Sequence, residues 1–202
     1  ADGARTATLL NRLWPTLRAR VQGPIRIVDV GCGIGYVLRW MAANDALPAD
    51  AELIGCDFNG ALIDEARALA REEALDVRFE VADAFALGEP AHVFLSTGVL
   101  HHIAPDALPT FFGAQRDALA FFHSDFRRSA LAPLGSWVFH TARMREPLAL
   151  HDGILSAVRA WPADLLLTAA AEGTGRPISH LGARVHRWIP LPRAMHTIAM
   201  LP

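Results

Sequence analysis

The sequence contains no lysine: all 19 of its basic residues are arginine. Without lysine the chain has no Tyr-x-x-x-Lys pair, and this absence argues against a nicotinamide-dependent reductase. The formal net charge is -2, so the chain offers no broad cationic surface for the phosphate backbone of a nucleic acid. We therefore expect that nucleic acid is not its main partner.

Cysteine is scarce, since only Cys32 and Cys56 are present. We interpret both as free thiols in a reducing compartment. No apolar run is long enough to cross a bilayer, and the first residues lack a basic region followed by a hydrophobic stretch. We therefore expect a cytoplasmic protein without a membrane partner. A leader removed before residue 1 stays open, because the sequence does not begin with Met.

The remaining composition is that of an ordinary globular protein. Of the 202 residues, 52% are hydrophobic and 20% are charged, which is enough apolar chain for a sizeable core. The sequence shows no internal repeat and no interdomain linker. It therefore predicts a single domain over residues 1–202.

Strands alternate with helices along the first half of the sequence. Short runs of β-formers predict strands at residues 25–30, 51–57, 77–83 and 92–96. Amphipathic or alanine-rich stretches predict helices at residues 4–20 (disturbed at Pro15), 36–43 and 61–73. This alternation is typical of a parallel sheet covered on both faces.

The second half is less regular. Residues 111–128 hold five of the ten phenylalanines, and we interpret them as the core face of one long helix. The alternative is an aromatic-walled pocket in which Arg127 or Arg128 meets an acidic substrate. Further elements are predicted in the order strand 135–140, helix 148–160, helix 162–171, strand 183–189 and strand 195–200. The last two strands should run antiparallel, because too few residues join them for a crossover helix.

Three glycines at alternate positions follow the first predicted strand, in Asp29-Val-Gly-Cys-Gly-Ile-Gly35. Fixing glycine costs backbone entropy, so this cluster indicates a tight turn or a ligand that approaches the backbone closely. A glycine-rich turn between a strand and a helix suits a nucleotide-like ligand, because the start of the helix offers unpaired N–H groups. The spacing is G-x-G-x-G, which differs from the G-x-G-x-x-G of dinucleotide-binding proteins.

Acidic residues end the next two predicted strands. Asp57 ends the second strand, where a carboxylate can hold both hydroxyls of a ribose, and Asp83 ends the third. Each has a structural alternative as a helix cap or turn residue. The carboxyl ends of parallel strands meet at one edge of an open α/β sheet, so Asp29, Asp57 and Asp83 should converge where such sheets bind ligands.

The pattern from Asp29 to Gly35 resembles motif I of the class I S-adenosylmethionine-dependent methyltransferases. The segment Ser-Thr-Gly-Val-Leu-His-His-Ile at residues 96–103 is similar to the V-L-H-H segment after the fourth strand of many small-molecule methyltransferases. The resemblance runs from Ile25 to Pro202. It implies an α/β fold, a Rossmann-like three-layer sandwich with a mostly parallel seven-stranded sheet and an antiparallel last strand.

The resemblance also implies a cofactor, S-adenosyl-L-methionine, and the residues that bind it. Asp29 and the turn formed by Gly31, Cys32, Gly33 and Gly35 would hold the methionine part of the cofactor. Cys32 stands at a variable position of this turn, where we interpret it as a small apolar filler without a redox role.

The other implied cofactor contacts come from the ends of later strands. Asp57 would take the ribose, and Phe58 would lie beside the adenine. Asp83 and the backbone of Ala84 would read the edge of the adenine. Thr97 would contact the amino-acid moiety.

The methyl group of a sulfonium is already activated, so a methyltransferase mainly aligns the acceptor and excludes water. If the acceptor arrives protonated, His101 is our candidate for the general base, with a structural hydrogen-bonding role as the alternative. We interpret His102 as structural. A metal cluster of His92, Asp106 and His123 is not expected, because no ligand spacing supports it.

These features predict an enzyme that transfers a methyl group from S-adenosylmethionine to an oxygen or nitrogen of a small molecule. Residues 1–22, 100–134 and 143–181 would form a lid and the helices that cover the substrate. The alternatives are an RNA or protein methyltransferase that depends on a partner, or a non-catalytic nucleotide-binding protein on the same fold. A homodimer stays open. The N/D-P-P-Y/F segment of enzymes that methylate nucleobase and glutamine amino groups is absent after the fourth strand.

Overall fold

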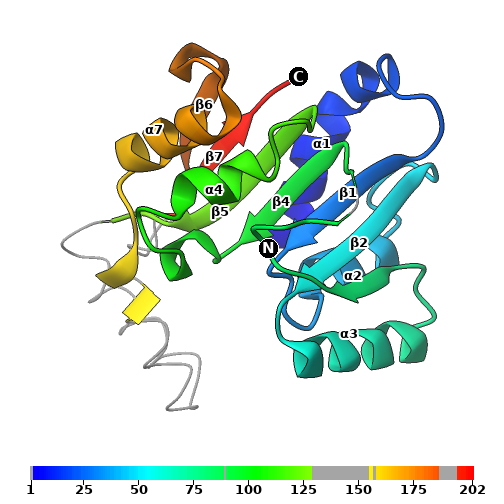
Figure 1. The fold of residues 1–202 in the computed structure, drawn as a ribbon. Helices are drawn as coiled ribbons and strands as arrows, with labels where there is room; N and C mark the ends of the chain where they lie inside the picture. The colour runs from blue at the N-terminus through cyan, green and yellow to red at the C-terminus, as the bar shows by residue number, and fades with distance from the viewer. Residues whose placement is uncertain (1, 89, 129–154, 157, 187–194) are drawn as a thin grey trace. The chain divides into compact units, whose positions relative to one another are not determined.

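The computed structural model describes residues 2–88, 90–128, 155–156, 158–186 and 195–202 (Figure 1). Seven strands follow one another across the sheet in the order β3-β2-β1-β4-β5-β7-β6. Their bounds are β1 (Ile25–Val30), β2 (Ala51–Asp57), β3 (Arg78–Val81), β4 (Val93–Thr97), β5 (Ala120–Phe126), β6 (Leu181–His186) and β7 (Met195–Met200). The predicted Rossmann-like sheet, mostly parallel with an antiparallel end, is confirmed.

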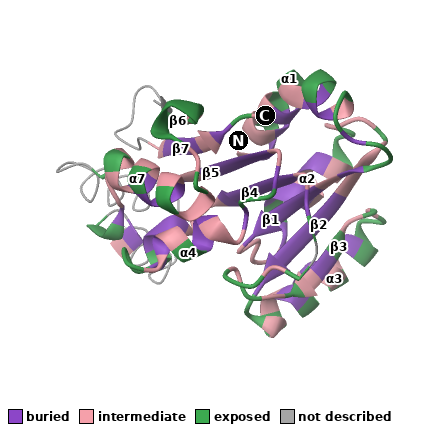
Figure 2. Cartoon of the chain, turned by 45° about the horizontal axis from the view of Figure 1, so that its top comes forward, coloured by how far each residue is buried: buried purple, intermediate pink, exposed green. Residues whose placement is uncertain are grey.

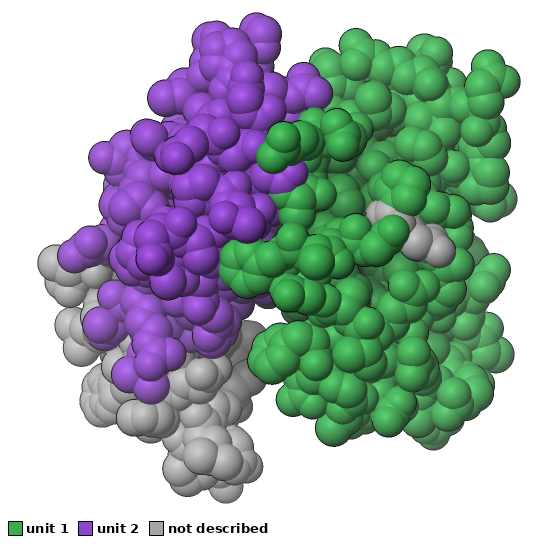
Figure 3. All heavy atoms as spheres, in the orientation of Figure 1, with its two compact units in different colours: residues 1–97, 114–121, 201–202 green, residues 98–113, 122–200 purple. Residues whose placement is uncertain are grey.

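The main helices are α1 (Asp2–Arg18), α2 (Tyr36–Ala43), α3 (Gly60–Glu72), α4 (Leu108–Gly113) and α7 (Ala163–Thr174). Two short 3₁₀ helices are η1 (Leu100–His102) and η2 (Ile178–His180). The chain divides into two compact units, which Figure 3 colours separately. Unit 1 comprises residues 1–97, 114–121 and 201–202, and unit 2 comprises residues 98–113 and 122–200.

Unit 1 contains the four parallel strands of the first half. β1 pairs in parallel with β2 and with β4, and β2 pairs in parallel with β3. Residues of β1, β2 and β4 are buried at nearly every position (Figure 2), because parallel strands carry helices on both faces. The strands lie within a few residues of their predicted bounds. Helix α1 continues through Pro15 to Arg18, so the predicted disturbance does not end it.

Unit 2 contains the antiparallel pair. β6 and β7 pair antiparallel from Leu181↔Met200 to His186↔Met195, as predicted. Helices α4 and α7 pack closely: a Cβ on Gly173 would lie 2.1 Å from the carbonyl oxygen of Pro109. A small residue is therefore needed where these two helices meet.

The prediction for the middle of the chain was wrong. Residues 111–128 do not form one long helix: α4 ends at Gly113, and the fifth strand is β5, at Ala120–Phe126. The predicted strand at 135–140 and most of the helix at 148–160 lie outside the described residues. β5 is buried at nearly every position, so its apolar residues follow no period of two. A short run of this kind cannot be told from a buried helix by periodicity alone.

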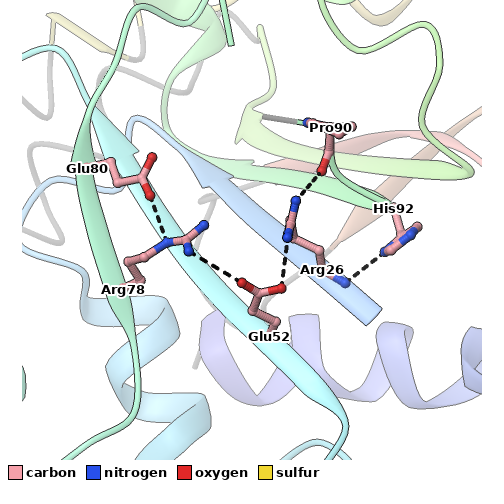
Figure 4. A network of polar contacts seen from close by, with 6 residues as sticks. All are labelled: Arg26, Glu52, Arg78, Glu80, Pro90 and His92. Atoms are coloured by element: carbon pink, nitrogen blue, oxygen red, sulfur yellow. Dashed lines mark hydrogen bonds and ion pairs between the residues drawn. The ribbon is translucent and has the colours of Figure 1, made fainter. Parts of the chain in front are cut away.

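The amino-terminal ends of β1, β2 and β3 are joined by a polar network (Figure 4). Glu52 accepts from Arg26 at 3.0 Å and pairs with Arg78 at 3.6 Å, while Arg78 also pairs with Glu80 at 2.7 Å. The backbone N–H of Arg26 donates to Nδ1 of His92 at 2.9 Å. Surface ion pairs of this kind each contribute little to stability, but together they tie three strands in register.

Among the described residues, no helix combines the length and the apolar character needed to span a membrane.

Candidate functional site

The turn after β1 is built by glycines in a left-handed conformation. Gly31, Gly33 and Gly35 have φ angles of +68°, +55° and +74°. A Cβ on Gly35 would lie 2.3 Å from the ring of Phe79, so side-chain packing requires glycine there. A Cβ on Gly33 would have no neighbouring atom within 4 Å. Gly33 therefore leaves open space beside the backbone, which is the space that a ligand needs.

Hydrogen bonds from β2 hold this turn. The backbone N–H groups of Gly31 and Cys32 donate to the carbonyl oxygen of Cys56 at 2.8 and 3.0 Å. The N–H of Gly33 donates to Oδ2 of Asp57 at 3.0 Å, and the N–H of Asn59 donates to Oδ1 at 2.9 Å. The Asp57 carboxylate thus shapes the turn, and its remaining lone pairs can still accept from a ligand.

Asp29 is the most buried of the three acids predicted for the site. It is 2% exposed, and its Oδ1 has no hydrogen-bond partner. Burial, with a smaller contribution from the negative charge of Asp57, raises the pKa of Asp29 from 3.8 to about 8. A buried carboxylate oxygen without a partner costs free energy. A cationic ligand at the turn would supply the missing interaction.

Both cysteines flank this acid as free thiols. Burial, together with the charge of Asp29, raises the pKa of the Cys32 thiol and raises that of Cys56 to about 12. A Cβ on Gly55 would lie 2.8 Å from Sγ of Cys32, so this sulfur packs tightly over β2. The protonated thiols are poor nucleophiles and poor metal ligands.

The residues predicted to bind adenine follow the ends of β2 and β3. Phe58 is 84% exposed, and Val81 and Phe85 are exposed as well. Asp57 pairs with Val81 in the parallel register, so Phe58 and Asp83 follow neighbouring strand ends. Oδ1 of Asp83 accepts from the backbone N–H of Phe85 at 2.9 Å, as in the turn alternative considered above. An exposed aromatic ring next to a strand end offers a stacking surface for a base.

Two other predicted residues have simpler surroundings. Ala84 is half-buried in the turn after Asp83, and Thr97 is the half-buried last residue of β4. The cap alternative for Asp57 does not apply to α3, because Asn59 caps that helix by accepting from the N–H of Ala61 at 3.1 Å.

In unit 2, His101 on η1 is buried against an acid that the sequence interpretation missed. Its Nδ1 lies 2.8 Å from Oδ1 of Asp125, and its backbone N–H donates to Oδ2 of the same carboxylate at 2.8 Å. Nε2 of His101 is buried without a hydrogen-bond partner. The exposed ring of His102 lies 4.0 Å away between ring centroids.

Asp125 was missed because its strand was interpreted as a helix. The signal that could have found it is the one that identified Asp57 and Asp83: an acid at the end of a buried apolar run. The part of the chain that the structure describes contains no group of three or more His, Cys, Asp or Glu arranged to hold a metal. Burial lowers the pKa of His123 to about 3, and its ring packs against Phe111 and Phe112.

Comparison with known proteins agrees with this geometry. Residues 27–120, from β1 to the start of β5, match the sequence family described as a methyltransferase domain. A search of the curated proteins found no match. Solved structures with the same fold include the plantazolicin methyltransferase in complex with a substrate analogue and SAH (S-adenosylhomocysteine). Its TM-score is 0.67 at 13% identity, and the match covers 99% of this chain and 84% of that one.

Two further structures show how far the likeness extends. Magnesium protoporphyrin IX methyltransferase from Synechocystis PCC 6803, with bound SAH, has a TM-score of 0.64 at 16% identity, covering 100% of this chain and 84% of that one. A protein from Nostoc punctiforme PCC 73102 has a TM-score of 0.64 at 14% identity, covering 99% of this chain. The present chain spans only 55% of the length of that relative.

The sheet order, the glycine turn and the matched family together indicate the class. Residues 27–120 match the methyltransferase-domain family, and the solved methyltransferase structures share the fold of the chain.

Proposed function

We propose that this protein transfers the methyl group of S-adenosylmethionine to an oxygen or nitrogen atom of a small molecule and releases S-adenosylhomocysteine. The observation that carries the acceptor chemistry is the buried, unpartnered Nε2 of His101. An imidazole nitrogen with a free lone pair can accept a proton. Two of the structurally similar proteins are named as methyltransferases of plantazolicin and of magnesium protoporphyrin IX.

The residues of the turn fit the cofactor. The open space at Gly33 would admit the methionine part, and a ligand that carries a sulfonium and an ammonium group would favour the ionised form of Asp29, whose Oδ1 has no partner. Gly31, Cys32 and Gly35 complete this turn. When bound, the cofactor supplies an electrophilic methyl carbon; the protein's task is to hold it and orient the acceptor.

The nucleoside would lie along the ends of β2 and β3. Asp57 would bind the ribose hydroxyls while continuing to hold the turn, and Phe58 would stack on the adenine. Asp83 and the backbone of Ala84 would contact the adenine edge. Thr97 would contact the amino-acid moiety.

His101 would act as the general base of the transfer. Nε2 of His101 would take the proton that the acceptor oxygen or nitrogen gives up when it is methylated. General base catalysis of this type contributes about 10²- to 10⁴-fold in rate. The base matters only for acceptors that carry a proton on the nucleophile at the working pH.

The test is methyl transfer from isotopically labelled S-adenosylmethionine to pooled phenols, carboxylic acids and amines, followed by mass analysis. We expect label in a small-molecule product and a turnover at least about 100-fold slower for His101→Ala. The control is His180→Ala, which removes an exposed imidazole of unit 2 and should turn over like the wild type. Label found only on protein or RNA would contradict the small-molecule acceptor. Binding of cofactor without transfer to any pool would favour a non-catalytic protein.

A further inference from the structure

We propose that Asp125 is a positioning residue for His101: it holds the imidazole with its proton on Nδ1, so that Nε2 is the nitrogen that takes the acceptor's proton. This inference rests on the proposed function and assigns a second residue to it.

Both oxygens of the Asp125 carboxylate form a hydrogen bond with His101. Oδ1 of Asp125 lies 2.8 Å from Nδ1 of His101, and Oδ2 accepts the backbone N–H of the same residue at 2.8 Å. The same carboxylate therefore forms hydrogen bonds with both the ring and the main chain of His101. The side chains are only 3% and 2% exposed, so water does not compete for these hydrogen bonds.

The position of Asp125 is fixed independently of His101. Oδ1 also accepts from the backbone N–H of Phe126 at 2.6 Å. The edge of the Phe126 ring packs against the imidazole, with 5.6 Å between centroids. Asp125 is thus held at the end of β5 by its own strand, which gives His101 a rigid reference.

The chemistry of the pair sets the tautomer. An ionised carboxylate can only accept hydrogen bonds, so Nδ1 must carry the proton that it donates to Asp125. In the neutral imidazole Nε2 then has a free lone pair, and this nitrogen is buried without a hydrogen-bond partner in the structure. Both ring nitrogens of His196 are also buried without a partner, so the feature that distinguishes His101 is its pairing with Asp125.

His196 on β7 is a titratable residue on the same face of the sheet as Asp125, as the neighbouring side chains show. Ser124 on β5 and Thr197 on β7 share a side-chain hydrogen bond of 2.8 Å. Because side chains alternate along a strand, Asp125 and His196 project from the opposite face. Burial lowers the pKa of His196, the charge of Asp125 opposes this, and Arg127 adds to it.

The other histidines near the pair do not change the interaction between the charge of Asp125 and the imidazole of His101. His123 lies two residues before Asp125 and is neutral near pH 7, since burial lowers its pKa to about 3. His102 packs on the imidazole from η1. When His101 takes a proton from the acceptor, the new imidazolium therefore lies directly against the Asp125 carboxylate, which stabilises it.

The experiment combines kinetics with a direct view of the ring. In the wild-type protein, ¹⁵N NMR of labelled histidine should show His101 protonated on Nδ1 and not on Nε2. Asp125→Asn removes the negative charge while keeping the shape. We expect kcat to fall about 100-fold, the acidic limb of the kcat–pH profile to move to lower pH, and KM for S-adenosylmethionine to stay within about twofold.

A matched control separates positioning from packing. Thr197→Val removes the part-buried hydrogen bond between the side chains of Thr197 and Ser124 in unit 2 and leaves the His101–Asp125 pair itself in place, so its pH profile should match the wild type. A substrate that is already ionised at the assay pH needs no base, so Asp125→Asn should transfer to it at nearly the wild-type rate.

The possible outcomes separate the role of Asp125 from that of His101. If His101→Ala slows transfer and Asp125→Asn does not, Asp125 has no positioning role although the proposed base stands. If His101→Ala leaves the rate unchanged, the proposed base itself is wrong. If the wild-type ring carries its proton on Nε2, the tautomer assignment is overturned, and this NMR result needs no active variant.

Discussion

The backbone N–H of Gly33 donates a hydrogen bond of 3.0 Å to the carboxylate of Asp57. This bond joins the glycine turn after the first strand to the acid that ends the second. Asp57 therefore has two tasks in the proposed site, since it shapes the turn and lies where the ribose of the cofactor should bind. Removing Asp57 would disturb both, so a simple loss of affinity would not reveal which task matters.

A cycle with a modified ligand separates the two tasks of Asp57. S-adenosylhomocysteine and its 2′-deoxy analogue would each be titrated into wild type and Asp57→Ala by calorimetry. We expect the wild type to bind the deoxy analogue about 10- to 150-fold more weakly, because the lost hydrogen bond to a charged acceptor is worth about 1.5–3 kcal/mol. In Asp57→Ala the two ligands should bind alike. An equal penalty in both proteins would mean that Asp57 only shapes the turn.

The raised pKa of Asp29 predicts that cofactor affinity depends on pH. Without ligand, Asp29 is protonated below pH 8, since burial raises its pKa from 3.8 to about 8. A cationic ligand favours the carboxylate, so binding below pH 8 must release a proton. The affinity for S-adenosylmethionine should rise by up to about tenfold per pH unit toward pH 8 and then level off.

Calorimetry in buffers of different ionisation enthalpy measures that proton directly. Asp29→Asn keeps the shape but cannot ionise, so it should bind with a pH-independent affinity and release no proton at this site. The same affinity at pH 6 and pH 8 in the wild type, with no proton released, would show that Asp29 does not respond to the ligand.

Asp29 should also make the folding stability of the ligand-free protein depend on pH. Its contribution to stability should fall as the pH rises, whereas the affinity for the cofactor should rise. Asp29 has a higher pKa in the folded state, so its contribution is fully present below pH 3.8 and is lost as the pH rises toward 8. Asp29→Asn should therefore gain stability relative to wild type as the pH rises from 5 to 8. Urea unfolding at several pH values measures this difference, and a constant difference would contradict the assignment.

Phe58→Ala tests the adenine contact. Phe58 is 84% exposed, so its removal should hardly change the melting temperature. Stacking of a base on an aromatic ring is worth about 1–3 kcal/mol, which predicts a Kd for S-adenosylhomocysteine about tenfold higher. Ile178→Ala, an exposed apolar residue of unit 2, is the control and should bind like the wild type. An unchanged Kd for Phe58→Ala would place the adenine elsewhere.

His92 provides a test of the polar network at the other end of the strands. Burial lowers the pKa of His92, and the charges of Arg26 and Arg18 lower it further. The stability that neutral His92 contributes is therefore present above pH 6.5 and is lost as the pH falls below it. His92→Ala should cost about 1 kcal/mol at pH 7.5 through the lost hydrogen bond from Arg26, and less at pH 5.5. Equal costs at both pH values would argue against this account.

The sequence predicted the first half of the fold closely, because each element there has a distinct local pattern. β1 and β2 begin and end where their apolar runs do, and the glycines after β1 predict a turn. β5 was missed because its residues are buried at nearly every position and carry no period. The pairing of the last two strands followed from the short connection between them.

The candidate site was predictable only in part, for a related reason. Asp57 and Asp83 could be placed at strand ends as soon as the strands were recognised. Asp125 needed the correct fifth strand, and its partnership with His101 joins residues 24 positions apart in the chain. Burial, which sets the pKa of Asp29 and leaves its Oδ1 without a partner, is a property of the folded protein that no local pattern reports.

The most direct test of the account is a calorimetric titration of S-adenosylhomocysteine into wild type, Gly33→Ala and Gly175→Ala. Gly33 and Gly175 have similar φ angles of +55° and +67°, and a Cβ at either would meet no atom within 4 Å. The two substitutions thus strain the backbone alike, but only the first fills the proposed cofactor space. We predict one site in wild type, unchanged affinity in Gly175→Ala, and at least tenfold weaker binding in Gly33→Ala, about 1.4 kcal/mol or more. No binding to wild type, or equal binding to all three proteins, would contradict the central claim that this turn holds the cofactor.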